Sequence, residues 1–211
     1  EHHAFWWNSP RLADLPWLRT FDSAPVPTVV ARNFGAAWPT VLNGLGADLS
    51  PAIHAFGERF PSLAGWYTTQ IARPPRTFIH GDLRLDQLFF GVEPGDPDVT
   101  ALDWQVSAVG RGAYDVAYFL SQSLATDTRR SCEPDLLARY LDRLATHGID
   151  YPATEFARDY RLTTAWCFTY PVLAAGLVDL ANERQLHLIR TMLSGAVAAI
   201  DDHDALALHP D

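Results

Sequence analysis

The chain of 211 residues is 48% hydrophobic and 12% aromatic, which is enough to bury a core and excludes a disordered protein. Its net charge of −9 and its lack of lysine argue against nucleic acid as a partner, because phosphate binding relies on clustered positive side chains. With only two cysteines, Cys132 and Cys167, no visible signal peptide and no apolar stretch long enough for a bilayer, we expect a soluble, cytoplasmic protein without a membrane partner.

The first third of the chain has the periodicity and the start signals of helices. The Trp6-Trp7 segment has a helical pattern. Ser9-Pro10 and Ser50-Pro51 each place an N-cap residue before a proline at the first helical position. Pro61 is expected to end one helix and start another. The helices expected in this region span residues 9–18, 28–44, 52–59 and 61–72.

Between residues 76 and 104 the pattern changes to short apolar runs that are typical of strands. We expect strands at residues 77–80, 88–91 and 99–102. A Glu-Pro-Gly-Asp-Pro-Asp turn at residues 93–98 is expected to join the last two. We further expect the strand that ends before Asp103 to lie beside the strand that ends at His80.

Helical periodicity resumes after this β region. The expected helices span residues 112–124, 133–146, 154–170 and 182–200. No repeat or low-complexity linker interrupts the pattern. The sequence therefore predicts a mainly helical α+β fold, a single domain over residues 1–211, with a small β element at its functional end.

Polar side chains gather on the turns of the β region, where function tends to concentrate. Asp82 follows a strand and a tight turn, so it can accept a proton from a substrate hydroxyl. Arg84 lies in the same loop and can offset charge on a transferred phosphoryl group. Asp82, Gln87 and Asp103 are expected to converge on one ion, and their oxygen atoms suit Mg²⁺. Asp86 is equally consistent with a turn residue and with a residue of the site.

The segment His80-Gly81-Asp82-x-x-x-x-Gln87, followed by Leu102-Asp103-Trp104, resembles the catalytic core of the aminoglycoside phosphotransferase and choline kinase-like superfamily. It looks most like the bacterial members that are similar to ecdysteroid kinases. The resemblance implies a protein-kinase-like C-terminal lobe in which a small β-hairpin element carries the catalytic loop. It also implies an ATP- and Mg²⁺-dependent kinase that phosphorylates a small-molecule hydroxyl.

The same resemblance implies roles for individual residues. Asp82 would be the catalytic base and Asp103 a magnesium ligand. Gln87 stands where the family has an asparagine ligand, and its amide oxygen is one methylene further from the backbone. Arg84 matches the lysine of the protein-kinase catalytic loop. Two further residues would support the nucleotide and the loop: Phe89 as the floor under adenine, and Asp115 as an acceptor of backbone hydrogen bonds. His80 is expected to pack in the core and orient the loop.

The missing lysine limits this resemblance to half of a kinase. A nucleotide-dependent phosphotransferase normally places a lysine on the nucleotide phosphates. The resemblance covers the chain only as a C-terminal lobe, and the N-terminal lobe with its glycine-rich loop has no counterpart here. We therefore expect the N-terminal lobe of the same protein to make most ATP contacts, and the 211 residues alone to be inactive.

Two other functions stay open. A catalytically silent binding module or pseudokinase is consistent with the missing lysine and with Gln87. A metal-dependent hydrolase built on His80, Asp82 and Asp103 is weaker, because no second close histidine completes a site. Asp82 and Asp103 can also be mere turn residues, and Arg84 can belong to a surface salt bridge. The acceptor is not identified, and aminoglycosides, choline-like cations, sterols and sugars all remain open.

Three further groups of residues have simpler interpretations. The tryptophans of the first half are expected in the core. The cluster Asp201-Asp202-His203-Asp204 is expected to be a solvated helix end rather than a metal site. Trp166, Phe168 and Tyr170 are expected in the core, with an acceptor pocket as the alternative. The tryptophans in question are Trp6, Trp7, Trp17, Trp38 and Trp66.

Overall fold

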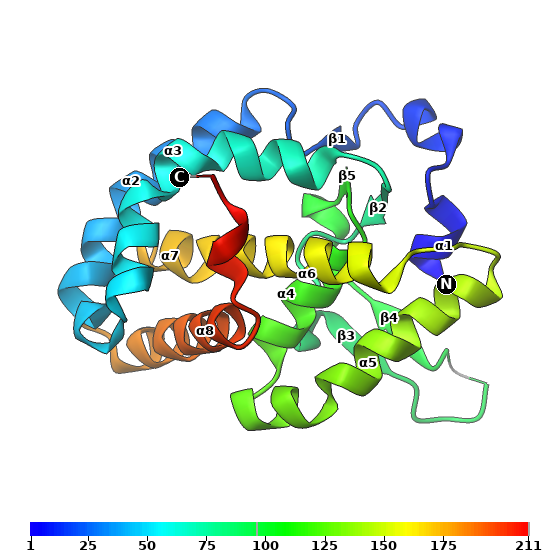
Figure 1. Cartoon of the computed structure of the whole chain (residues 1–211). Helices are drawn as coiled ribbons and strands as arrows, with labels where there is room; N and C mark the ends of the chain where they lie inside the picture. Colours follow the sequence, from blue (N-terminus) through cyan, green and yellow to red (C-terminus); the bar gives the residue numbers. More distant parts are fainter. Residues whose placement is uncertain (96, 211) are drawn as a thin grey trace.

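Helices dominate the computed structural model, which describes residues 1–95 and 97–210 (Figure 1). The hairpin β3–β4 and helix α1 lie at one end of the molecule, and α2 with α7 lies at the other. The α-helices are α1 (His2–Trp6), α2 (Val26–Leu45), α3 (Pro51–Ala72), α4 (Ala113–Ser123), α5 (Thr126–Thr146), α6 (Ala153–Cys167), α7 (Thr169–Ala175) and α8 (Glu183–Asp202). The strands are β1 (Arg19–Thr20), β2 (Thr77–Ile79), β3 (Leu88–Phe90), β4 (Val99–Ala101) and β5 (Ala108–Gly110).

Helix α6 runs through the middle of the molecule, with α3 on one side of it and α8 on the other (Figure 1). Its side chains Phe156, Tyr160 and Trp166 are buried in a hydrophobic core to which α2, α3, α4, α7 and α8 all contribute. Aromatic rings meet there, with the rings of Phe34 and Phe60 4.4 Å apart. Burying each such side chain stabilises the fold by about 1.5–3 kcal/mol relative to leaving it exposed.

The strands form two small sheets, and their pairing differs from the prediction. The expected strands at 77–80, 88–91 and 99–102 exist to within one residue at each end. However, β4 pairs with β3, whereas β2 pairs with β5, which the periodicity missed. The predicted neighbour of β2 was therefore wrong. Three-residue strands carry too little alternation to specify a partner. Asp96, in the expected turn 93–98, lies outside the described residues.

Proline explains most of the differences in the helices. The predicted break at Pro61 was wrong, because α3 continues through it with buried side chains on both sides. Helix α5 begins at Thr126, earlier than predicted, and contains Pro134. The predicted helix 154–170 divides at Phe168 into α6 and α7. Pro171 cannot donate to the carbonyl four residues earlier, so the hydrogen-bond ladder of α6 stops and α7 begins with this proline in its first turn.

Several smaller expectations have clear outcomes. Ser9-Pro10 starts a 3-10 helix that ends at Asp14 rather than a helix to Leu18. Trp17 is not a core residue, because 62% of it is exposed, whereas Trp38 is buried. Within the described part of the chain, no helix is long and apolar enough to cross a bilayer. In the cluster that ends α8, Asp202 forms ion pairs with Arg129 and Arg130.

Candidate active site

The loop that follows β2 is held by its backbone. Asp115 of α4 accepts hydrogen bonds from the amides of His80 at 2.7 Å and of Gly81 at 3.0 Å. Gly81 has a φ of +88°, and a Cβ on it would lie 2.5 Å from the carbonyl oxygen of Val106. A glycine is therefore required here, both by the backbone conformation and by the contact. The result is a fixed backbone directly before Asp82.

Asp115 is itself fixed by a contact from the first helix. His3 of α1 lies with its Nε2 3.0 Å from Asp115 Oδ2, and its Nδ1 is 3.0 Å from the Tyr140 hydroxyl. Burial by itself raises the pKa of Asp115, but the hydrogen bonds from His3, Gly81 and His80 outweigh it and lower that pKa. Asp115 is therefore a buried carboxylate that holds the loop, which is the role that the resemblance implies.

The His80 ring joins the two turns that carry aspartates. Its Nε2 lies 2.6 Å from the carbonyl oxygen of Leu102, the residue before Asp103. Its Nδ1 accepts from the amide of Asp82 at 3.3 Å. An accepting Nδ1 leaves the proton on Nε2, so these two contacts assign the neutral tautomer that donates to Leu102. His80 is 2% exposed and packs against the Trp104 ring at 4.7 Å.

The carboxylate of Asp82 has two neighbours on one of its oxygens. The hydroxyl of Tyr118 donates to Oδ1 at 2.7 Å. Nε of Arg84 lies 3.3 Å from the same oxygen, in an ion pair whose geometry is not that of a hydrogen bond. Arg84 also forms an ion pair with Asp86 at 3.3 Å. Burial and the contact with Asp82 raise the pKa of Tyr118, so its hydroxyl stays protonated and donates.

Gln87 and Asp103 lie at the same end of the hairpin β3–β4. The amide of Leu102 donates to the carbonyl oxygen of Gln87 at 2.8 Å, which extends the pairing by one step toward the turns. Gln87 is the last residue of the 3-10 helix η3 (Leu85–Gln87), directly before β3. Asp103 is exposed and has a φ of 59°, a left-handed conformation that aspartate tolerates better than most residues. Such conformations concentrate at functional sites.

The donor set at this end of the hairpin fits magnesium better than zinc. Mg²⁺ is usually bound by one or two carboxylates together with substrate phosphates and water. Asp103 offers an exposed carboxylate whose Oδ2 has a long contact of 3.4 Å with Gln105, and the Gln87 amide lies on the adjacent turn. Across residues 1–95 and 97–210, no group of three His, Cys, Asp or Glu side chains is placed to hold a metal. The described residues therefore supply no ligand cluster of the kind that a zinc hydrolase site needs.

Phe89 is an exposed aromatic residue of the hairpin. It is 60% exposed on β3, where it is paired with Thr100. Phe90 is 57% exposed. A two-stranded hairpin with both rings in water leaves apolar area that a flat ligand or a further protein segment can cover.

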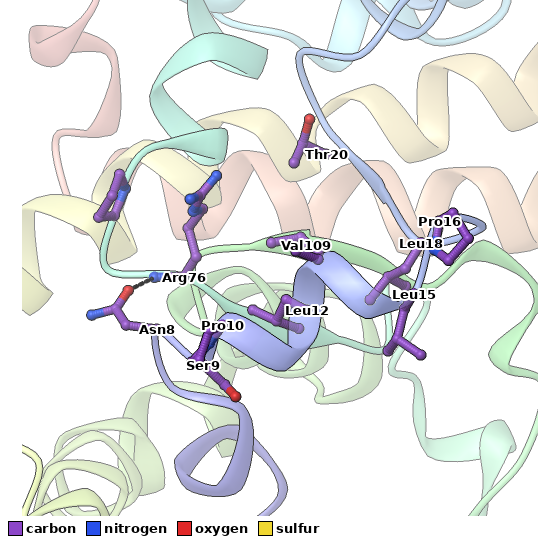
Figure 2. Close-up of a pocket in the computed structure, with 12 residues that line it drawn as sticks. Asn8, Ser9, Pro10, Leu12, Leu15, Pro16, Leu18, Thr20, Arg76 and Val109 are labelled. Carbon is purple, nitrogen blue, oxygen red and sulfur yellow. Dashed lines mark hydrogen bonds between the residues drawn. The ribbon is translucent and has the colours of Figure 1, made fainter.

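Figure 2 shows a different pocket, whose lining includes Val109 of strand β5 and whose volume is about 560 Å³. The amide of Arg76 donates to Asn8 Oδ1 across one wall of it at 2.8 Å. Neither aspartate turn contributes to its lining, so the pocket does not belong to the site assembled above. Its lining comprises Asn8, Ser9, Pro10, Leu12, Ala13, Leu15, Pro16, Leu18, Thr20, Pro74, Arg76 and Val109.

Sequence reasoning missed the tyrosines around the loop. Tyr114 and Tyr170 donate to the carbonyl oxygen of Gly81 at 3.1 and 3.3 Å, and Tyr118 reaches Asp82. The sequence predicted Tyr118 only as part of the helix at residues 112–124, and Tyr170 as a core residue. The available signal was their hydroxyl groups, because a buried tyrosine usually finds a hydrogen-bond partner.

A sequence profile of the ecdysteroid kinase-like family matches residues 38–150, more than half of the chain. No curated protein matches the sequence. The matched range includes the turns that carry Asp82 and Asp103 and all of α4. It therefore contains Asp115, which accepts hydrogen bonds from the loop, and Tyr118, which donates to Asp82.

Proposed function

Because the chain belongs to the ecdysteroid kinase-like family of kinase-like phosphotransferases that act on small molecules, we propose that it is the catalytic and acceptor-binding C-terminal lobe of an ATP- and magnesium-dependent kinase. The acceptor is a hydroxyl group of a small molecule. One observation carries the proposal: the His80 ring bonds to Leu102 at 2.6 Å, so the turns bearing Asp82 and Asp103 touch each other.

The residues divide the chemistry between them. Asp82 accepts the proton of the acceptor hydroxyl as the new oxygen–phosphorus bond forms and the bond to the leaving ADP oxygen breaks. Arg84 offsets negative charge beside the transferred group. Asp103 and Gln87 would hold magnesium, which when bound neutralises charge on the nucleotide phosphates. Because the transition state is loose, positioning and charge stabilisation contribute more than proton removal.

Most nucleotide contacts come from outside these residues in this proposal. The chain has no lysine, so the lysine that binds nucleotide phosphates belongs to an N-terminal lobe of the same protein. Phe89, exposed on β3, forms the floor under adenine. The 211 residues are thus one domain of a cytoplasmic enzyme that is inactive without the other lobe. Its partners are that lobe and the small acceptor, with no nucleic acid and no membrane.

The test is ADP release by the full-length protein with Mg·ATP and a panel of alcohols: ecdysone, choline, kanamycin and glucose. We expect acceptor-dependent turnover that Asp103→Asn reduces at least as much as Asp82→Asn. Asparagine is used because it tolerates the left-handed backbone at position 103. Wild-type turnover in Asp103→Asn would end the assignment of this residue as the metal ligand.

Gln87 favours a second candidate, a catalytically silent binding module. Its longer side chain displaces the amide oxygen from the position that asparagine takes in the family. A Gln87→Asn variant separates the two candidates. In an active kinase this variant keeps or raises turnover, whereas a silent module stays inactive in both forms. A thermal shift with Mg·ATP then reports binding, because a ligand of the native state raises its stability; no shift in the full-length protein favours the silent module.

A further inference from the structure

We propose that Tyr118 is a positioning residue that makes the two oxygens of Asp82 inequivalent, so that Oδ2 alone receives the acceptor proton. The inference rests on the proposed kinase function and adds to it the residue that aims the catalytic carboxylate. Its basis is the hydrogen bond of 2.7 Å from the Tyr118 hydroxyl to Asp82 Oδ1.

The two oxygens of Asp82 have different surroundings. Oδ1 accepts the Tyr118 hydrogen bond and lies 3.3 Å from Nε of Arg84. Within residues 1–95 and 97–210, Oδ2 has neither a hydrogen bond nor an ion pair. The Asp82 side chain is 24% exposed, so an incoming molecule can reach it. A hydroxyl that approaches Asp82 therefore finds one occupied oxygen and one with open lone pairs.

Tyr118 is rigid enough to act as a reference point for this carboxylate. It is 2% exposed, and its ring packs on the Tyr170 ring at 4.3 Å between centroids. It also stacks on Tyr114 at 6.2 Å. Both neighbours donate to the Gly81 carbonyl oxygen, so one aromatic group fixes the loop and the carboxylate together. Side chains that are locked by packing hold a catalytic group within the narrow range that the reaction needs.

The direction of donation matters for the chemistry. The Tyr118 hydroxyl gives its hydrogen to Oδ1, so that oxygen cannot rotate toward the acceptor without breaking the bond. The Asp82 carboxylate then holds one orientation, and the acceptor hydroxyl meets Oδ2 along a fixed line. Loss of the hydroxyl leaves Arg84 as the remaining neighbour of Oδ1, in an ion pair that lacks hydrogen-bond geometry.

The experiment compares Tyr118→Phe with Tyr151→Phe in the full-length protein. Tyr151 is a matched control, because it is also buried and also donates to an aspartate, Asp159, at 2.5 Å. With the panel acceptor that wild type uses, we expect Tyr118→Phe to lower kcat by about 10- to 100-fold with KM nearly unchanged. Tyr151→Phe is expected to keep kcat within about twofold. Both variants lose a comparable amount of Tm.

A double-mutant cycle and a crystal structure complete the test. If Tyr118 acts through Asp82, then adding Tyr118→Phe to Asp82→Asn changes kcat by less than about twofold. Crystals of full-length Tyr118→Phe should show Asp82 in more than one rotamer, and this readout needs no turnover. An unchanged kcat, a raised KM with unchanged kcat, or a single unchanged Asp82 rotamer each overturns the proposal. A full-length wild type that shows neither turnover with the panel nor a thermal shift with Mg·ATP counts against the kinase function instead, and the rotamer result still decides the orienting role.

Discussion

Gly81 is the position where a single methyl group should disturb the candidate site most. Its φ of +88° lies in a region that side chains with a Cβ rarely adopt, and the added Cβ would meet the Val106 carbonyl oxygen at 2.5 Å. The neighbouring atom is backbone, so it cannot rotate away. Gly81→Ala must therefore move either the loop before Asp82 or the segment after Asp103.

The loss of stability expected for Gly81→Ala has two parts, and the same substitution at a second glycine separates them. The left-handed conformation alone costs an alanine about 1–2 kcal/mol. Overpacking against a rigid neighbour adds about 1–3 kcal/mol. Gly148 has a φ of +75° and open space around its missing Cβ, so Gly148→Ala meets only the first cost. We expect Gly81→Ala to lower the free energy of unfolding by about 2–5 kcal/mol and Gly148→Ala by about 1–2 kcal/mol.

Urea unfolding of wild type and both variants measures these differences directly. In the full-length protein, turnover should fall in Gly81→Ala because the loop that carries Asp82 shifts, and should persist in Gly148→Ala at temperatures where that variant is folded. Equal losses of stability in the two variants would refute the close approach of Gly81 to Val106. Unchanged turnover in Gly81→Ala would refute the requirement for a fixed loop before Asp82.

Three further predictions concern the proposed metal ligand Asp103, the pH dependence of stability, and a buried ion pair. Asp103→Asn should lower turnover by at least about 100-fold, yet change the free energy of unfolding by less than about 0.5 kcal/mol because the side chain is exposed; urea unfolding and ADP release check both. The lowered pKa of Asp115 stabilises the fold above the ordinary carboxyl pKa of about 3.9 and ceases to do so as the pH falls through the lower folded value. The stability difference between wild type and Asp115→Asn should therefore be constant near neutral pH and narrow below about pH 4, whereas a difference that widens there contradicts the sign. Asp159→Ala removes the buried partner of Arg111 and should cost about 3–5 kcal/mol in urea unfolding, and a loss below about 1 kcal/mol would mean that water reaches this pair.

Local signals in the sequence predicted local structure well. Ser50 caps α3 by accepting from the Ile53 amide at 3.3 Å, as its position before Pro51 indicated. Strands β2, β3 and β4 lie where their apolar runs place them. Pro61 misled the prediction because burial of the surrounding helix faces outweighs one missing hydrogen bond. Propensity is a weak prior wherever tertiary packing decides.

The sequence likewise indicated only the local part of the candidate site. Asp82, Asp103 and Gln87 stand out because their chemistry and their spacing are written in one short segment. The contacts that aim them come from far away, since Tyr118 lies 36 positions from Asp82 and His3 lies 112 positions from Asp115. Such pairs depend on how α1 and α4 pack against the loop. The hydrophobic periodicity of the sequence does not predict that packing.

Helix α4 connects these two levels. Asp115 and Tyr118 are three residues apart, so they project from the same face of the helix. One fixes the backbone of the loop through the amides of His80 and Gly81, and the other fixes the carboxylate of Asp82. A rigid shift of α4 would move both supports together and preserve the geometry between the loop and its side chain. The orientation of Asp82 therefore depends on one rigid helix. This suits the proposed phosphoryl transfer, a reaction in which positioning contributes more than proton removal.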